Sequence, residues 1–176
     1  APELTPQIVR YTGIVLGVQE PGGPRVVAVG RRGGPGSAPL DGQAVLEIGS
    51  VSKVFTTLLL AEMVGRGEVA LEDPVQRYLP ASVKVPERNG RVITLLDLAT
   101  ATSGLPRLPA LEPTDPTNPY LDYRAEQLYA FLNGYTLPRD PGASYEYSSL
   151  GRGLLGDALE RRAGKPCEAL VAERLL

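Results

Sequence analysis

Hydrophobic and polar positions near the start of the chain follow the pattern of two β-strands. The runs "QIVRYTGIVLGVQ" and "RVVAVGRR" are rich in β-branched residues, and "EPGGP" between them supplies the glycines and prolines of a turn. Two such runs joined by a short turn are typical of an antiparallel hairpin. We therefore predict a hairpin over residues 7–31, followed by a loop in "GGPGSAPLDGQ".

The pattern changes at Ser50, where "SVSKVFTTLLLAEMVGRG" places apolar residues on nearly every side of a helix. Gly65 and Gly67 favour the end of that helix. Because a helix that is hydrophobic all round is normally buried, the pattern predicts a central buried helix over residues 50–64.

Helical patterns dominate the rest of the chain. Asp73 is predicted to cap a short helix that has Pro74 at its first position. Thr94 and Asp97 have the spacing of a capping box, which predicts the start of another helix. The Ser-Gly pair at residues 103–104 is predicted to end it.

Three more helices are predicted further along. They cover residues 124–134, residues 149–164 with Gly164 as the last residue, and a segment that starts at Pro166 and continues to the C-terminus. The stretch "PRLPALEPTDPTNP" at residues 106–119 is rich in proline and polar residues, and helical patterns lie on both sides of it. It is therefore predicted to be a surface loop rather than a domain linker.

Together these elements indicate an α+β fold in a single domain over residues 1–176. An antiparallel sheet at 7–31 precedes the central helix at 50–64 and a mainly helical region at 73–176. An isolated hairpin is marginally stable in water, and three or more strands are normally needed. We therefore expect part of the sheet to be missing from this sequence.

Composition narrows the classes of function. The 176 residues are 43% hydrophobic, enough for a globular core, and the formal charge is −2. No basic run is present, which argues against nucleic acid or an anionic membrane surface as a partner and leaves a small molecule or another protein. No run of about 18 apolar residues exists, so no membrane span is predicted. The start "APELTPQ" suits a mature terminus left after cleavage, from which we expect export to the periplasm or the medium.

The sequence has no histidine and one cysteine, and these counts exclude several chemistries. A Ser-His-Asp triad, a Cys-His pair and nearly every zinc site need histidine, so proton transfer must use lysine, tyrosine or a carboxylate. Cys167 has no partner cysteine and is interpreted as a helix residue rather than a reactive thiol. We expect no metal and no organic cofactor.

Ser50 and Lys53 form the one candidate nucleophile pair. Side chains three residues apart at the start of a helix lie on the same face and can meet. The Ser50 hydroxyl would lie at the positive end of the helix dipole, where a free backbone N–H can stabilise an oxyanion. A lysine in an apolar pocket has a lowered pKa and can take the serine proton. The alternative is that Ser50 only caps the helix and Lys53 reaches water.

The segments around this pair resemble one known family. "EIGSVSKVFTTLLLAEMVGRGEVALEDPVQRYLP" is similar to the nucleophile segment of the serine β-lactamase and penicillin-binding protein superfamily, in particular the branch of class C β-lactamases, esterases and D-alanyl-D-alanine peptidases. The resemblance continues through "ITLLDLATATSGLP" and "PGASYEYSSLGRGLLGDALE". It implies a β-lactamase/transpeptidase-like fold, apparently incomplete at the C-terminus.

The resemblance also implies a third catalytic residue. In the family, a Tyr-x-Asn motif supplies the tyrosine that works with the lysine as general base and acid, and Tyr147 in "YSS" matches its position. An ordinary phenol has a pKa near 10, but a neighbouring cation such as Lys53 makes the pair useful at lower pH. Tyr145 stands two residues away, so it remains an alternative, as does a Tyr147 without chemistry.

The sequence departs from the family pattern at three places. Ser149 replaces the usual asparagine, and its shorter hydroxyl shifts the expectation from β-lactam turnover toward ester hydrolysis. Ala101 stands where many relatives have histidine, which we expect to matter little. The sequence also stops at "VAERLL", before the strand with the Lys-Thr-Gly or His-x-Gly motif and its second oxyanion donor. One lost donor costs about 100- to 1000-fold in rate, so we expect this chain alone to be weakly active or inactive. We expect it to be the N-terminal part of such an enzyme, truncated, cleaved or completed by residues outside this sequence.

These features predict a serine hydrolase that forms an acyl-enzyme. Ser50 would attack a carbonyl, Lys53 and Tyr147 would move protons, and Ser149 would orient the substrate, a β-lactam, a short ester or a D-alanyl peptide. The expected partners are this substrate and the missing C-terminal part of the same protein. The main alternative is a catalytically silent penicillin-binding or scaffold protein with the same fold. A carbohydrate-binding module is disfavoured, because only two Phe and no Trp are present.

Overall fold

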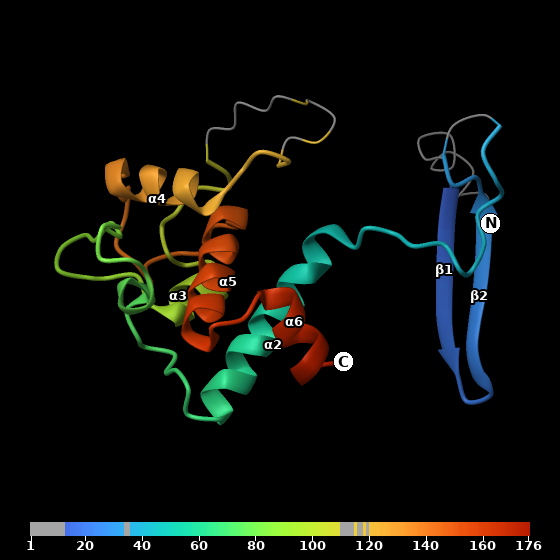
Figure 1. Ribbon diagram of the computed structural model, residues 1–176, viewed down its shortest axis with the longest axis horizontal. Coiled ribbons are helices and arrows are strands. Elements are labelled where there is room, and N and C mark those ends of the chain that lie inside the picture. Colours follow the sequence, from blue (N-terminus) through green and yellow to red (C-terminus); the bar gives the residue numbers. More distant parts are fainter. Residues whose placement is uncertain (1–12, 34–35, 110–114, 116–117, 119) are drawn as a thin grey trace. The chain divides into compact units, whose positions relative to one another are not determined.

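The computed structural model describes residues 13–33, 36–109, 115, 118 and 120–176 (Figure 1). The chain forms two compact units, a first unit of Ala1–Ile48 and a second unit of Gly49–Leu176. In order, the elements are the strands β1 (Gly13–Glu20) and β2 (Gly23–Gly30), the 3-10 turn η1 (Gly49–Val51), helix α2 (Ser52–Gly65), the 3-10 turn η2 (Val75–Tyr78), and helices α3 (Leu95–Ala99), α4 (Ala125–Gly134), α5 (Ser149–Ala163) and α6 (Cys167–Arg174). The single domain expected from the sequence stays a prediction.

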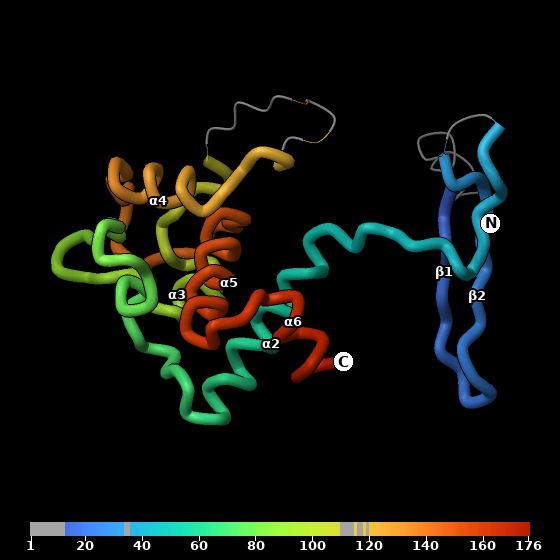
Figure 2. The backbone as a smooth tube through the Cα atoms, in the orientation of Figure 1, coloured from blue at the N-terminus to red at the C-terminus, as the bar shows by residue number. Residues whose placement is uncertain are grey.

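The first unit contains an antiparallel hairpin (Figure 2). Its register runs from Gly13 opposite Gly30 to Glu20 opposite Gly23, so only two residues form the connection. Gly23 has a φ of 115°, which a residue with a side chain rarely adopts. The structure thus contains the predicted hairpin, although residues 7–12 of that prediction lie outside the described residues.

Helix α2 is buried on one face within the second unit. Its buried side chains are Leu59, Leu60 and Met63, on the face that packs against α5 and α6. Val54 and Leu58 on another face are 54% and 48% exposed. The predicted buried helix is thus confirmed for the face that packs within the second unit, and burial of its other face stays a prediction. The helix also begins two residues after Ser50.

Helix α5 is the centre of the second unit, where it contacts α2, α3, α4, α6 and η2. The hydroxyl of Ser148 caps its N-terminus by accepting the N–H of Gly151 at 2.8 Å. Gly164 ends it in the left-handed conformation, with a φ of 68°, in agreement with the predicted boundary. Its buried positions repeat every three or four residues: Leu150, Gly151, Leu154, Leu155, Ala158 and Leu159.

The capping box of α3 is confirmed, but the helix is shorter than predicted. Thr94 Oγ1 accepts the N–H of Asp97 at 3.1 Å, and the Asp97 carboxylate accepts the N–H of Thr94 at 2.9 Å. The helix ends at Ala99 rather than at residues 103–104. Ala101 has a φ of 58°, which ends the right-handed path before the predicted glycine is reached.

The predicted cap at Asp73 is wrong. Pro74, not Asp73, is the N-cap residue of η2, and no side chain caps this turn. The Asp73 carboxylate instead accepts the N–H of Ala70 at 2.8 Å and bonds to Arg77 and to the Tyr78 hydroxyl. These local partners use the oxygens that a cap would need, so Asp73 stabilises the preceding turn.

The remaining helices agree with the sequence to within a residue or two. Helix α4 starts one residue after the predicted 124, and α6 follows Pro166 but ends at Arg174, before the end of the chain. Arg174 Nη1 lies 3.1 Å from Glu62 and 3.0 Å from Glu68, which ties α6 to α2. Most of the predicted loop at 106–119 lies outside the described residues.

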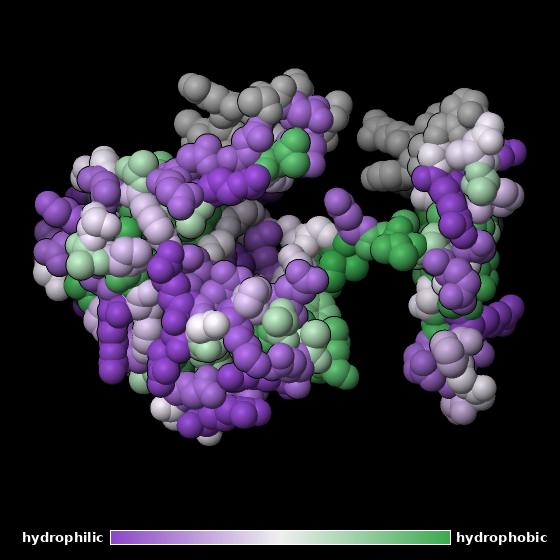
Figure 3. Space-filling view, in the orientation of Figure 1, coloured by the Kyte–Doolittle hydropathy of each residue, from purple (hydrophilic) through white to green (hydrophobic). Residues whose placement is uncertain are grey.

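The buried hydrophobic core of the described residues lies entirely in the second unit, between Leu59 and Leu170. The visible surface of this unit is mainly hydrophilic, and hydrophobic side chains gather around the segment that leads into α2 (Figure 3). No helix among the described residues is both long and apolar enough to cross a membrane.

Candidate active site

Ser50 lies in the turn that leads into α2. It is the middle residue of η1, and Gly49 before it has a φ of 54°, a left-handed conformation that favours glycine. The Ser50 side chain is exposed. Its backbone N–H belongs to the first turn, where amides have no acceptor within the helix. This position offers an accessible hydroxyl beside an available N–H donor.

Lys53 is the second residue of α2 and lies directly beside Ser50. Its Nζ is 3.1 Å from Ser50 Oγ, so the two side chains meet as the spacing of three residues predicts. The lysine is half-buried and lines a pocket of about 370 Å³ together with Val54, Thr57, Leu58, Ala61 and Arg152. Ser52, between the two, bonds instead to the carbonyl of Gly49 at 2.8 Å. The turn therefore presents one serine, not two, to the lysine.

Tyr147 completes the cluster from the segment before α5. Its hydroxyl donates to Ser50 Oγ at 2.6 Å, and its ring centroid lies 5.2 Å from Lys53 Nζ. Tyr145, the alternative, is 69% exposed and has no hydrogen bond to Ser50 or Lys53 in this structure. The arrangement therefore brings Ser50, Lys53 and Tyr147 together and leaves Tyr145 aside.

The environment of Tyr147 favours its ionised form. Hydrogen bonding with Lys53, followed by hydrogen bonding with Ser50, lowers the pKa of Tyr147 from 10.0 to about 8. The positive charge of Lys53 and the Ser149 hydroxyl act in the same direction, whereas partial burial opposes them. A phenol of this pKa is a usable base in mildly alkaline solution.

Ser149, the predicted substrate-orienting residue, is the first residue of α5. Its N–H donates to the carbonyl of Arg107 at 2.9 Å, and its hydroxyl interacts with Tyr147. Ser149 also lines an almost wholly apolar pocket of about 150 Å³, together with Leu108, Pro109, Tyr120, Tyr123, Leu128, Leu150 and Gly153. It thus joins the hydroxyl cluster to an apolar cavity.

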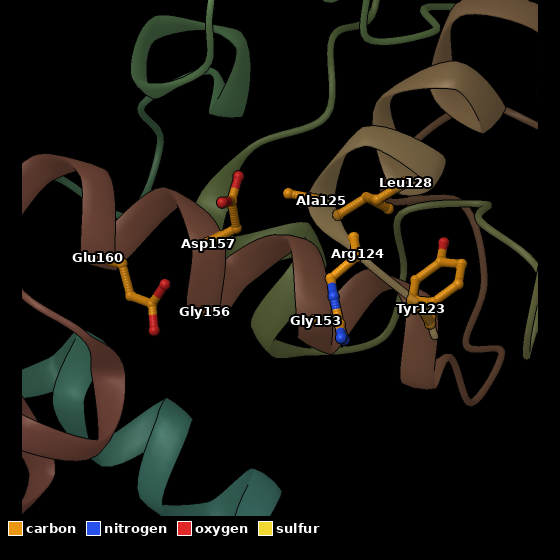
Figure 4. A pocket seen from close by; sticks show the side chains of 8 residues that line it. All are labelled: Tyr123, Arg124, Ala125, Leu128, Gly153, Gly156, Asp157 and Glu160. Atoms are coloured by element: carbon orange, nitrogen blue, oxygen red, sulfur yellow. The ribbon is translucent and has the colours of Figure 1, made fainter. Parts of the chain in front are cut away.

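A third pocket of about 280 Å³ lies between α4 and α5, and none of the three clustered residues lines it (Figure 4). Its two carboxylates, Asp157 and Glu160, come from α5 and have partners within the chain. Asp157 accepts the Tyr129 hydroxyl at 2.6 Å, and Glu160 accepts the N–H of Cys167 at 2.6 Å.

Burial is the main cause that raises the pKa of Cys167, so its thiol is less readily ionised than an ordinary one. In the described part of the chain, no group of three or more His, Cys, Asp or Glu side chains could hold a metal ion.

Two arginines near the cluster were not found from the sequence. The guanidinium carbon of Arg107 lies 5.1 Å from the ring centroid of Tyr147. Arg152 bonds to Thr57 Oγ1 and donates to the carbonyl of Ala99 at 2.8 Å, so it connects α5 to α2 and α3. Neither position has a spacing pattern relative to Ser50 that would indicate these contacts, because both depend on tertiary packing.

Comparison with known proteins gives a consistent result. The family model described as Beta-lactamase matches residues 4–176. The chain is 37% identical over 132 residues to the D-alanyl-D-alanine-carboxypeptidase/endopeptidase AmpH of Escherichia coli (strain K12), a match that covers 75% of this chain and 34% of that protein. It is 31% identical to a β-lactamase of Pseudomonas fluorescens (78% and 36% covered) and 29% identical to the esterase EstB of Burkholderia gladioli (78% and 38% covered).

A solved structure extends the likeness to the fold. The β-lactamase/D-alanine carboxypeptidase from Yersinia pestis, complexed with citrate, superposes with a TM-score of 0.80 at 27% identity. The superposition covers 99% of this chain and 53% of that one, so the fold is of the β-lactamase/transpeptidase type. The chain spans about a third of the length of the curated relatives that it matches. On the family match and the fold together, the chain belongs to the β-lactamase family.

Proposed function

We propose that this protein is a serine hydrolase that forms an acyl-enzyme on Ser50. The observation that supports this most is that two groups able to accept or donate a proton, from Lys53 and Tyr147, both contact the Ser50 hydroxyl oxygen. Lys53 Nζ lies 3.1 Å and the Tyr147 hydroxyl 2.6 Å from Ser50 Oγ. A nucleophile hydrogen-bonded to its base, with a second group that orients the base, is the usual arrangement for covalent catalysis.

In the first half of the proposed reaction, the Tyr147 phenolate accepts the Ser50 proton while Oγ bonds to the substrate carbonyl carbon. The electron pair of the C=O bond moves to its oxygen, where the Ser50 N–H stabilises the negative charge. Tyr147 then returns the proton to the leaving group as the tetrahedral intermediate breaks down to the acyl-enzyme. Lys53 stabilises the phenolate and relays protons.

In the second half, Tyr147 acts on water. It accepts a proton as the water oxygen attacks the acyl carbon, and it returns this proton to Ser50 Oγ when the acid product leaves. Ser50 and Tyr147 are thus regenerated in their starting states. The proposed cycle consumes one water per substrate and needs neither a metal nor an organic cofactor.

The proposed substrates are carbonyl compounds of three classes: β-lactams, short esters and D-alanyl peptides. Ser149 supports recognition of a substrate amide or ester, because its hydroxyl lies at the junction of Tyr147 and the apolar pocket. That pocket favours an apolar acyl or alcohol group. We also propose that further residues of the same protein form the other wall of the site. Export to the periplasm or the medium is part of the proposal as well, and fractionation of producing cells tests it.

The proposal is tested by incubating the protein with a fluorescent penicillin and with short-chain chromogenic esters, followed by peptide mass spectrometry. We expect an acyl adduct on Ser50 and none in S50A. S52A is the matched control, because Ser52 is also a serine of this turn but bonds to Gly49 rather than to Lys53. No adduct from either reagent on a folded protein would refute the proposal.

A silent penicillin-binding protein is the second candidate, favoured by Ser149 where an asparagine is usual. A hydroxyl cannot give the paired carbonyl and amide contacts of asparagine, which weakens the orientation of the substrate. In the same experiment, this candidate predicts an adduct on Ser50 that persists without turnover. Release of product in many equivalents would exclude it.

A further inference from the structure

A second cation lies against the Tyr147 ring, and the proposed reaction does not use it. The guanidinium carbon of Arg107 is 5.1 Å from the ring centroid, about as close as Lys53 Nζ at 5.2 Å. Cations within about 6 Å of an aromatic centroid are attracted to the ring. Tyr147 therefore has two cationic neighbours, one from α2 and one from the segment after α3.

The backbone next to Arg107 is bonded to the residues that follow Tyr147. Ser148 Oγ donates to the carbonyl of Pro106 at 2.6 Å. The Arg107 carbonyl accepts the N–H of Ser149 at 2.9 Å and that of Leu150 at 3.4 Å. These three bonds fix the backbone of Pro106 and Arg107 to the start of α5. The Arg107 side chain therefore extends from a backbone whose position relative to Tyr147 is fixed.

The placement has an electrostatic consequence. A positive charge beside the ring interacts more favourably with the phenolate, which carries a full negative charge, than with the neutral phenol. The arginine also has a planar group suited to stacking, which a lysine lacks. Its contact restricts rotation of the ring away from Ser50, since a ring that turned aside would lose it.

We propose that Arg107 is a positioning residue for Tyr147: its guanidinium holds the ring so that the hydroxyl stays at Ser50 Oγ, and it stabilises the phenolate that accepts the serine proton. The consequence for the rate rests on the proposed function. The contact between Arg107 and Tyr147 itself does not depend on turnover. The role differs from substrate binding, which would act on affinity and not on the ionisation of Tyr147.

The test compares R107Q and R107K in the full chain with the unchanged protein. R77Q is the matched control, because Arg77 is also an exposed arginine near a tyrosine ring, at 5.8 Å from the centroid of Tyr78. Two quantities are measured against pH: the rate of Ser50 acylation, and phenolate absorbance in the near ultraviolet. Y147F identifies which part of the absorbance change belongs to Tyr147 among the eight tyrosines.

For R107Q, we expect acylation at neutral pH to slow about two- to fivefold, with a smaller loss in alkaline solution, where Tyr147 is ionised in both proteins and only the positioning of its ring differs. The phenolate transition of Tyr147 should move to higher pH in R107Q, move less in R107K, and stay in place in R77Q. If R107Q does not fold, the shift in R107K decides.

An unmoved phenolate transition in R107Q, or a rate loss of the same size at every pH, would overturn the inference. A change in KM alone would indicate a substrate contact and would overturn it as well. If no acylation occurs in any variant, the proposed function has failed, and the absorbance titration still decides whether Arg107 acts on Tyr147.

Discussion

The Tyr147 hydroxyl donates a 2.6 Å hydrogen bond to Ser50 Oγ across 97 positions of sequence. The bond joins the turn before α2 to the segment before α5, so it exists only if these two helices pack correctly. It converts a local serine and lysine pair into a three-residue cluster.

Replacing Tyr147 by phenylalanine removes the proposed proton acceptor and keeps the ring. We expect acylation of Ser50 to slow by about 100- to 10,000-fold, the usual contribution of a general acid or base. The measurement is the rate of adduct formation by mass spectrometry. Y145F, which alters the exposed neighbouring tyrosine, should keep the full rate. Equal losses in the two variants would contradict the role of Tyr147.

The acylation rate should depend on pH through the ionisation of Tyr147. Its pKa of about 8 predicts a low rate at neutral pH that rises through pH 8 and levels off above it. The rise follows the phenolate, because only this form accepts the Ser50 proton. An absorbance titration should show one tyrosine that ionises before the others and disappears in Y147F. A rate that falls over this range would contradict the assignment.

The same pKa has a consequence for stability. Because the folded-state pKa of Tyr147 lies below its ordinary value of 10.0, the contribution of this group to folding is fully present above pH 10 and is lost as the pH falls through about 8. Denaturant unfolding of the unchanged protein and of Y147F over this range measures it. The difference between the two free energies of unfolding should change with pH in that direction, and a change of the opposite sign would contradict it.

The capping box of α3 should contribute measurably to stability. T94A removes the hydroxyl that accepts the N–H of Asp97, and we expect a loss of about 1 kcal/mol in the free energy of unfolding. Urea denaturation followed by circular dichroism measures it. T100A is the control, since the exposed Thr100 hydroxyl donates to the carbonyl of Leu96 and caps no helix N-terminus. A loss in T100A as large as in T94A would argue against the cap.

Adjacent leucines of α2 should differ strongly in their contribution to stability. Leu59 is fully buried, so L59A should cost about 2–5 kcal/mol through lost contacts and the cavity left behind. Leu58 is 48% exposed, and L58A should cost much less. The measurement is again the free energy of unfolding in urea. Similar costs at both positions would show that the second face of α2 is covered in solution.

Local signals predicted much of the fold. Thr94 and Asp97 indicated the start of a helix, because a capping box involves only neighbouring residues. Gly164 indicated the end of a helix, because glycine readily adopts the left-handed conformation found there. The prediction at Asp73 failed, although an acid before a proline is typical of a helix cap. The Asp73 carboxylate instead bonds to other nearby groups, the N–H of Ala70 and the hydroxyl of Tyr78. The side of α2 that packs within the second unit could not be identified from the sequence, because apolar residues on all sides of a helix do not show which face another element covers.

For the candidate site too, the sequence indicated the contact between neighbouring residues but not the contacts between distant ones. The spacing of Ser50 and Lys53 alone indicated that the two side chains meet, since one helical turn fixes their separation. Tyr147 required the resemblance to a family, because no spacing rule links residues 97 positions apart. Arg107 gave no signal at all, since a cation in a loop has no preferred aromatic partner until the loop is folded.

The bonds from Ser148, Ser149 and Leu150 to Pro106 and Arg107 also bear on how substrate preference can be engineered. They anchor the connection between α3 and α4 at Pro106 and Arg107, and Arg124 anchors its far end as the N-cap residue of α4. A connection held at both ends tolerates changes of length at small entropic cost. Libraries that exchange Leu108, Pro109 and Tyr120, which line the apolar pocket and lie between these two anchors, should therefore yield folded proteins with altered selectivity, while the Tyr147 phenol keeps its place beside Ser50.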